Sequence, residues 1–188
     1  MIIQKSLIAK ELVAQKLRDK KIVIIPTDTV YGFSGLVPDT DEIIRKIKGR
    51  EETKPFIQLI GNPSDIYNYT NDDIPAQLLD YWPGPLTIIV NDKMGKTTTA
   101  FRCPGDLWLR DVINIVGAPV FSTSVNRSGM SIIHDVVDME KEFGSEVDCI
   151  IDGGTMEDGL PSTLVDISKG IISVLRQGAI QISSICSK

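Results

Sequence analysis

Residues 22–33 have the sequence IVIIPTDTVYGF. The first four residues are an uninterrupted apolar and β-branched run, which predicts a strand buried on both faces. The run ends at Pro26 and passes into a polar loop that offers hydroxyl groups, a carboxylate and backbone amides. This loop could be a simple Asx or Ser/Thr turn, since Thr and Asp favour turns. Its place at the end of a buried strand also makes it a candidate binding loop.

Helical and strand patterns alternate on both sides of this stretch. Residues 6–20 predict an amphipathic helix with Ser6 as its cap. Its apolar residues at helical spacing, which we expect to face the core, are Leu7, Ile8, Leu12, Val13 and Leu17.

The remaining elements follow along the chain. A second helix that reaches about Lys48 could be capped by Asp39, Thr40 or Asp41. Further helices are predicted over residues 74–82, 107–116 and 133–143, and further strands over residues 56–60, 86–90, 118–123, 149–152, 163–167 and 172–175. The alternation predicts an α/β or α+β sheet protein.

The length and composition fit a single compact domain over residues 1–188. Hydrophobic residues make up 42% of the chain, and a chain of this length could bury roughly 70% of the surface that its unfolded form exposes. No internal repeat or low-complexity linker divides it. The cysteines, Cys103, Cys149 and Cys186, are odd in number and widely spaced. We therefore expect reduced thiols rather than a disulfide framework or a zinc site.

The distribution of charge bears on location and on partners. Residues 1–21 carry charges every few positions and lack the apolar core of a signal peptide and the length of a membrane span. We therefore expect a cytoplasmic protein that does not associate with a membrane. The formal net charge is -5 and the pI is about 4.9. Sequence-independent binding to a nucleic-acid backbone is thus not the expected main activity, although a local basic cleft could exist.

The usual motifs of nucleotide-binding proteins and hydrolases are missing. Residues 94–98, MGKTT, resemble the end of a phosphate loop, but Val90 stands where such a loop needs a glycine, and we predict a solvated hairpin turn. The sequence contains no GxGxxG, HExxH or GxSxG motif. Its single histidine, His134, falls in a predicted surface helix with no neighbouring nucleophile. This argues against Ser-His-Asp and Cys-His catalysis.

Two further polar clusters contain groups that suit phosphate. Lys48 and Arg50, with Lys54 following, lie at the end of a predicted helix. A compact ammonium beside a forked guanidinium suits a polyphosphate, although cations there could simply complement the helix dipole. Residues 122–129, STSVNRSG, follow an apolar strand with hydroxyls, an amide and backbone N–H groups. They could orient phosphate oxygens or form an ordinary polar loop.

The last cluster combines residues 161–166, PSTLVD, with residues 175–178, LRQG. Arg176 supplies another cation, and Gly178 would let the backbone approach a ligand closely. A surface hairpin with a turn glycine is the alternative. Each cluster is thus of a type that suits an anion or a small zwitterion.

In combination, the clusters resemble the YrdC-like threonylcarbamoyl-AMP synthases over residues 22–180, which is nearly the whole chain. The family motifs occur in the same order and with similar spacing. They are P-T-[DE]-T-V-Y-G-[LF] at residues 26–33, K-x-R at Lys48 and Arg50, P-G-P-[LF]-T at 83–87, R-x-P at 102–104, S-x-N at Ser124 and Asn126 followed by S-G at Ser128 and Gly129, S-T-x-V-D at 162–166 and R-x-G at 176–178. Each motif is weak alone, but together they are specific.

The resemblance implies a twisted open mixed α/β sheet flanked by helices, with a concave cleft that holds ATP and threonine. It also implies a stand-alone synthase without the extra C-terminal domain of longer relatives. The implied site residues are Lys48, Arg50, Ser124, Asn126 and Arg176 for ATP, and Thr27, Thr29, Tyr31 and Ser162 for threonine. Among them, Lys48 and Arg50 are the implied catalytic pair, which clamps the triphosphate.

The implied reaction makes threonylcarbamoyl-AMP and pyrophosphate from L-threonine, bicarbonate or CO2 and ATP, for the threonylcarbamoyladenosine modification of tRNA. The threonine amine is carboxylated, and the resulting carbamate attacks the α-phosphorus of ATP. This chemistry needs positioning and charge neutralisation more than a nucleophile, in agreement with the missing triad. Magnesium would arrive with ATP, because no protein metal site is apparent. The product would pass to a threonylcarbamoyl transferase, and tRNA could bind weakly.

Two departures from the family pattern leave the acceptor open. Residues 130–134, MSIIH, replace a stretch that resembles Pro-Ser-Pro-Thr in many relatives, and residues 54–56, KPF, are also similar to a subgroup of less settled function. One alternative is therefore a carbamoyl-adenylate enzyme with a different acceptor. Another is a double-stranded-RNA or tRNA-binding module on the same fold, against which the acidic net charge argues. Its basic patch would consist of Lys48, Arg50, Lys54, Arg102 and Arg176.

Overall fold

A computed structural model describes residues 1–50, 55–156 and 159–182. The strands within these residues form one mixed sheet, in the order β1-β8-β2-β3-β7-β4-β6-β5-β9-β10. Their bounds are β1 Ile2–Gln4, β2 Val23–Pro26, β3 Tyr31–Leu36, β4 Ile57–Leu59, β5 Leu86–Asn91, β6 Thr98–Arg102, β7 Val120–Ser124, β8 Cys149–Asp152, β9 Thr163–Asp166 and β10 Ser173–Arg176. The helices are α1 Leu7–Arg18, α2 Asp41–Lys48, a 3-10 helix Pro63–Asn68, α3 Ala76–Leu79, α4 Leu107–Val116 and α5 Val136–Phe143.

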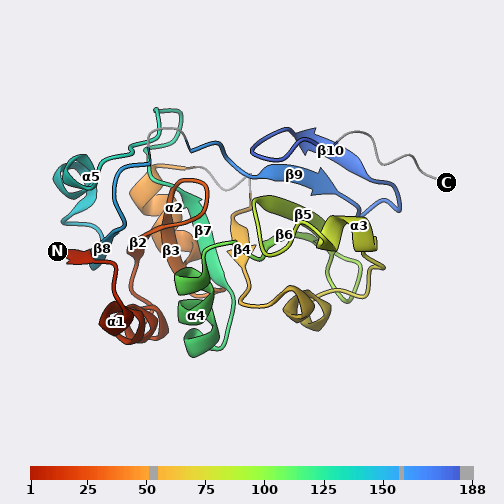
Figure 1. Ribbon diagram of the computed structural model, residues 1–188, viewed down its shortest axis with the longest axis horizontal. Helices are drawn as coiled ribbons and strands as arrows, with labels where there is room; N and C mark the ends of the chain where they lie inside the picture. Colours follow the sequence, from red (N-terminus) through yellow and green to blue (C-terminus); the bar gives the residue numbers. More distant parts are fainter. Residues whose placement is uncertain (51–54, 157–158, 183–188) are drawn as a thin grey trace.

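The sheet extends along the longest axis of the molecule, with β1 near one end and β10 near the other (Figure 1). The sheet contains parallel pairs, such as β2 with β8 and β5 with β9, and antiparallel pairs, such as β3 with β7 and β5 with β6. Since β1 and β10 each pair with one neighbour, the sheet is open. The predicted mixed sheet with flanking helices is confirmed.

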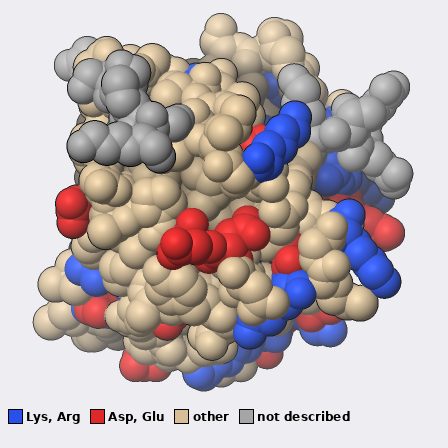
Figure 2. Space-filling model, turned by 90° about the vertical axis from the view of Figure 1, so that its right-hand side faces the viewer, with Lys and Arg blue, Asp and Glu red and all other residues tan. Residues whose placement is uncertain are grey.

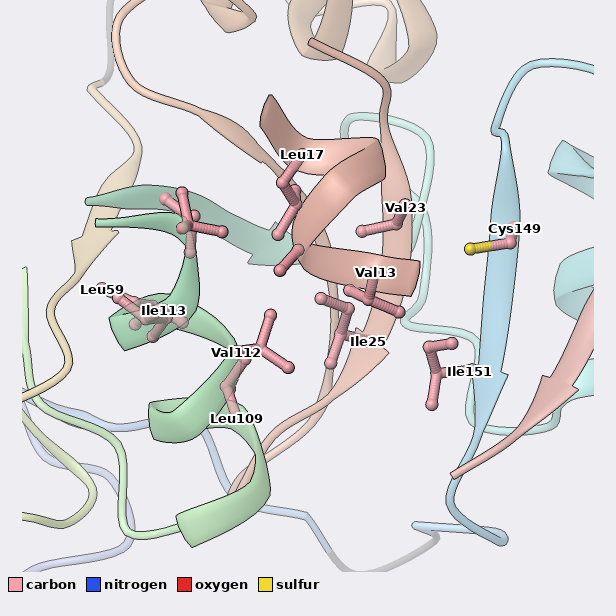
Figure 3. Close-up of a cluster of buried hydrophobic side chains, with 13 residues drawn as sticks. Val13, Leu17, Val23, Ile25, Leu59, Leu109, Val112, Ile113, Cys149 and Ile151 are labelled. Atoms are coloured by element: carbon pink, nitrogen blue, oxygen red, sulfur yellow. The ribbon is translucent and has the colours of Figure 1, made fainter. Parts of the chain in front are cut away.

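The strand β2 is buried on both faces, as its uninterrupted apolar run predicts. Val23 and Ile25 belong to the core beneath α1 and α4, which Figure 3 shows from close by. Ile24, between them, belongs to the core beneath α2 and α5 on the opposite face. Successive side chains of a strand point to opposite faces, so one short run contributes to both cores. The polar loop after β2 is thereby anchored to an interior strand of the sheet.

The helix α1 buries Val13 and Leu17, as we expected, but the rest of its buried face differs from the expectation. Leu7 and Ile8 are 77% and 87% exposed, and Leu12 is also exposed. The buried residues are Ala9, Val13, Ala14 and Leu17. Two alanines on the inner face let the helix approach α4 and the sheet closely, which longer side chains would prevent. The predicted cap is confirmed, because the Ser6 hydroxyl accepts from the Ala9 N–H at 3.3 Å.

Several other element predictions were shifted or incomplete. The helix expected over 74–82 is limited to the four residues of α3, which lie between Pro75 and the Trp82–Pro83 bond. The strands β1, β3 and β6 and the 3-10 helix were not predicted. His134 lies before α5 rather than within it, and its Nδ1 is 2.9 Å from the Met156 carbonyl oxygen. The hairpin turn over 94–98 is confirmed, since β5 and β6 pair on either side of it.

The structure supports two of the three expected reduced thiols. Cys103 and Cys149 are free and buried, whereas Cys186 lies outside the described residues. Within the described ranges, no helix has the length and apolar character to cross a membrane.

Candidate functional site

The first group of predicted site residues is built around Lys48, the last residue of α2. Gly49 ends the helix with φ +60°, a left-handed conformation that glycine adopts without strain. Lys48 is only 3% exposed. Its ammonium donates to the Ser124 carbonyl at 2.5 Å, to the Asn126 carbonyl at 2.9 Å and to Asn126 Oδ1 at 3.0 Å. The structure therefore joins Lys48, Ser124 and Asn126 through direct hydrogen bonds.

The polar side chains of the turn at residues 124–130 point into the turn itself. Ser124 Oγ donates to Asn126 Oδ1 at 2.7 Å. Asn126 Nδ2 donates to the carbonyl oxygens of Arg127 and Met130 at 2.9 and 2.7 Å. Both hydrogens of this amide are thus used within the turn. The backbone adds a further link, because the Ser128 N–H donates to the Lys48 carbonyl at 2.8 Å.

Arg50 follows α2 and stands apart from these hydrogen bonds. Its guanidinium lies 5.0 Å from the centre of the Phe56 ring. Burial, and in second place the charge of Arg45, lower the pKa of Arg50. Among the described residues it forms no ion pair. Lys54, the next cation along the chain, lies outside the described residues.

The second group is centred on Arg102 at the end of β6. Its guanidinium donates from Nη1 to Thr29 Oγ1 at 2.9 Å and from Nε to the Gly84 carbonyl at 3.1 Å, and its Nη2 forms an ion pair with Asp28. Thr27 Oγ1 shares a hydrogen bond of 2.9 Å with Thr29 Oγ1. The loop after β2 is thereby held against β6. Arg102 was quoted from the R-x-P motif but was not assigned to the site.

Arg176 and Ser162 extend the second group to β9 and β10. Arg176 donates to the Ser162 carbonyl at 2.9 and 3.2 Å. Ser162 Oγ shares a hydrogen bond of 2.7 Å with Thr87 Oγ1. Burial, and in second place the charge of Arg102, lower the pKa of Arg176. Of these two guanidinium groups, only that of Arg102 has a carboxylate partner in the described part of the chain.

Tyr31 belongs to neither group. Its buried hydroxyl donates to the Gly154 carbonyl at 2.7 Å and accepts from the Gly153 N–H at 2.9 Å. Burial is the main cause that raises the pKa of this hydroxyl. The backbone of Tyr31 accepts from the Val125 N–H at 3.3 Å, which connects β3 to the turn after β7. Tyr31 thus holds two loops, and its hydroxyl is already occupied by backbone groups.

Two surface cavities lie away from these groups. One of about 240 Å³ is lined by residues of the 3-10 helix and the end of α4, among them Asn62, Asp65 and Asn114. The other, of about 630 Å³, is lined by residues before and within α5, among them His134 and Asp138. Neither is lined by a predicted site residue, and the concave cleft stays a prediction. Within the described residues, no group of three or more His, Cys, Asp or Glu side chains is arranged to hold a metal ion.

Comparison with known proteins connects this arrangement to one family. Residues 15–178 match the Sua5/YciO/YrdC family model, which is described as telomere recombination. The threonylcarbamoyl-AMP synthase of Bos taurus is 32% identical over 181 residues, which cover 87% of this chain and 65% of that protein. The putative threonylcarbamoyl-AMP synthase of Methanocaldococcus jannaschii is 34% identical, with 93% and 88% covered. The chain therefore spans just under two thirds of the bovine relative.

A solved structure shares the fold. The crystal structure of Sua5 from Pyrococcus abyssi, complexed with L-threonine, superposes with a TM-score of 0.86 at 27% sequence identity. The match covers 95% of this chain and 57% of that one.

Proposed function

Because the chain belongs to the Sua5/YciO/YrdC family, we propose that it makes threonylcarbamoyl-AMP and pyrophosphate from L-threonine, bicarbonate or CO2 and ATP. The names of the bovine and archaeal relatives support this activity. The L-threonine in the Sua5 crystal structure supports threonine as the substrate. The product would serve the threonylcarbamoyladenosine modification of tRNA, through a downstream transferase. We also propose that residues 1–188 act as one domain, since one sheet runs through the described residues, and that the protein is cytoplasmic.

The observation that carries the proposal is the excess of positive charge in the second group. The charge of Arg102 adds to burial in lowering the pKa of Arg176, and the ion pair with Asp28 involves Arg102 alone. The hydroxyl of Thr29, on which we place threonine, accepts from Arg102, and Ser162, the other proposed threonine contact, accepts from Arg176 through its carbonyl. A partly buried guanidinium without a carboxylate suits an anion, either the carboxylate of threonine or a phosphate of ATP.

The nucleotide side of the proposed site consists of Arg50, the turn at residues 124–130 and Lys48 behind it. Arg176 would meet the phosphates from the opposite side. Threonine reacts with bicarbonate to give a carbamate and water, and a carbamate oxygen then attacks the α-phosphorus as pyrophosphate leaves. The residues serve by positioning and by neutralising charge, so no protein nucleophile is required. Magnesium would enter with ATP and would help to neutralise the charge of its phosphates.

Pyrophosphate release tests this function directly. Purified protein is incubated with ATP, magnesium and bicarbonate, with L-threonine, with L-serine or without an amino acid. We expect release that requires both L-threonine and bicarbonate. Release that ignores threonine would instead favour an enzyme with a different acceptor, and the absence of release would contradict the synthase.

The RNA-binding alternative is less compatible with the arrangement of the cations. Lys48 and Arg102 are 3% and 4% exposed, and both donate to groups inside the protein. A nucleic-acid backbone needs cations that it can reach from solvent. Figure 2 shows that the face at the β10 end of the molecule mixes acidic and basic side chains rather than presenting a continuous basic surface. A weak contact with tRNA stays part of the proposal.

A further inference from the structure

We propose that Lys48 does not contact ATP but is a positioning residue that holds the turn at residues 124–130, which we call the SxN turn, in its binding conformation. The inference rests on the proposed function, because it names the work of one residue within that site. It also refines the sequence-based assignment, which placed Lys48 beside Arg50 on the triphosphate.

The geometry of the ammonium group is the first argument. A lysine ammonium has three N–H donors and no acceptor. All three have an acceptor on the SxN turn, the carbonyl oxygens of Ser124 and Asn126 and the side-chain oxygen of Asn126. The residue is also almost fully buried. A phosphate oxygen could reach Nζ only by displacing one of these charge-assisted hydrogen bonds.

The state of the turn is the second argument. The side chain of Asn126 uses its amide hydrogens on Arg127 and Met130, and its oxygen accepts from both Lys48 and Ser124. The side chains of the S-x-N motif therefore shape the turn rather than project from it. The backbone N–H groups of Asn126, Arg127 and Gly129 have no acceptor within the described residues. These N–H groups are suited to donate hydrogen bonds to the oxygens of a phosphate.

The contrast with Arg50 is the third argument. Arg50 lies two residues away and has the same charge, yet its described contact is with the face of the Phe56 ring and with no carbonyl of the turn. It is the cation of the K-x-R pair whose donors stay available to a ligand. Lys48→Met and Arg50→Met therefore form a matched pair of variants, since each loses one positive charge at the same end of α2.

Steady-state kinetics in the pyrophosphate assay distinguish a specific effect of either variant on the KM for ATP from a general loss of structure. We expect both variants to raise the KM for ATP by about 10- to 100-fold, because each removes charge-assisted hydrogen bonds. The KM for threonine should change less than about twofold, since its proposed contacts lie in the second group. A purely structural role of Lys48 would lower kcat through the folded fraction and leave both KM values unchanged, which would contradict the proposal.

Amide hydrogen exchange of the ligand-free protein separates Lys48 from Arg50. In Lys48→Met we expect the amides of Val125, Ser128 and Ile133 to exchange at least about 10-fold faster, because the turn loses its central donor. In Arg50→Met these amides should exchange as in the wild type. Unchanged exchange in Lys48→Met would overturn the proposal. Because no substrate is present, this result does not depend on which reaction the protein catalyses.

A measurement on the wild type covers the case in which Lys48→Met does not fold. The Lys48 ammonium can be followed by NMR in protein labelled with 15N-lysine, and the less disruptive Lys48→Arg variant serves to assign its signal. In the wild type, we expect the protons of the Lys48 ammonium to be protected from exchange with solvent before nucleotide is added. A non-hydrolysable ATP analogue should leave this protection unaltered. Protection that appears only with the analogue would show a direct contact with phosphate and would refute the proposal.

Discussion

The two groups of site residues place their positive charges in different surroundings. Lys48 is surrounded by neutral oxygen acceptors of the SxN turn, and its hydrogen-bonding capacity is filled inside the protein. Arg102 is paired with Asp28, but its neighbour Arg176 donates only to Ser162 and has no carboxylate in the described residues. The charge of Lys48 is therefore satisfied without a ligand. The second group has a charge that a ligand anion can compensate.

This difference separates residues that form the site from residues that bind. A buried charge whose partners are all internal mainly determines the local conformation, and its removal leaves those partners unsatisfied. A cation held close to another cation raises the free energy of the ligand-free protein and attracts an anion. Arg102 and Lys48 should thus affect stability, whereas Arg176 should affect binding.

The largest effect is expected at the Arg102–Asp28 pair. Arg102→Met leaves the Asp28 carboxylate without its partner, and we expect the free energy of unfolding to fall by about 3–5 kcal/mol. Urea denaturation measures this loss. The double variant Asp28→Asn with Arg102→Met should recover part of it, because no uncompensated carboxylate is left.

The control is Lys20→Met, which breaks the exposed ion pair with Asp39. It should lower the free energy of unfolding by at most about 1 kcal/mol. Equal losses in Arg102→Met and Lys20→Met would contradict the comparison.

The next effect concerns pH and the first group. Burial, and in second place the charge of Arg50, lower the pKa of Lys48 from 10.5 to about 8. Between these values the unfolded chain binds more protons than the folded one, so the free energy of unfolding rises with pH on this account. The full rise amounts to about 3 kcal/mol. Over the same range Lys48 becomes a neutral amine, which has one N–H group fewer to donate to the SxN turn. The KM for ATP should therefore increase.

Urea denaturation and ATP kinetics at about pH 7 and about pH 10 test the expected rise in the free energy of unfolding and the expected rise in the KM for ATP. The wild type should gain stability relative to Lys48→Met as the pH rises, while its KM for ATP rises. Lys93→Met, which removes an exposed lysine after β5, is the control for the change in net charge. A wild type that loses stability relative to Lys48→Met over this range would contradict the assigned environment of Lys48.

Local sequence patterns predicted the elements whose residues have one strong preference. The helix α4 and the strand β8 have the predicted bounds, because the first begins at an Asp106 cap and the second is a continuous apolar run. The strand β3 was missed because YGFSGL contains two glycines, and its pairing with β7 rather than its propensity stabilises it. The buried face of α1 was predicted only in part, since Val13 and Leu17 are buried as expected whereas the small side chains of Ala9 and Ala14 take the places expected for larger residues.

The candidate site shows the same limit. The residues of the SxN turn and of the loop after β2 were found because each set is contiguous in the sequence. The partners Asp28 and Arg102 lie 74 positions apart, and no local pattern predicts their ion pair. The R-x-P motif was the one available signal for Arg102. The burial of Lys48 could not be predicted either, because a lysine at a helix end is usually solvated.

The smallest effect on stability and a clear effect on binding are expected at Arg176. Arg176→Met removes a hydrogen-bonded contact with Ser162 but also the repulsion by Arg102, so the free energy of unfolding should change by less than about 1 kcal/mol. The KM for the anionic ligand that it meets, which we propose to be ATP, should rise by about 10- to 100-fold. Lys169→Met changes an exposed lysine between β9 and β10 and should leave both quantities unaltered. If Arg176→Met instead destabilised the fold as strongly as Arg102→Met and left both KM values unchanged, the charge of Arg176 would be as fully satisfied inside the protein as that of Lys48. The distinction between forming the site and binding would then fail.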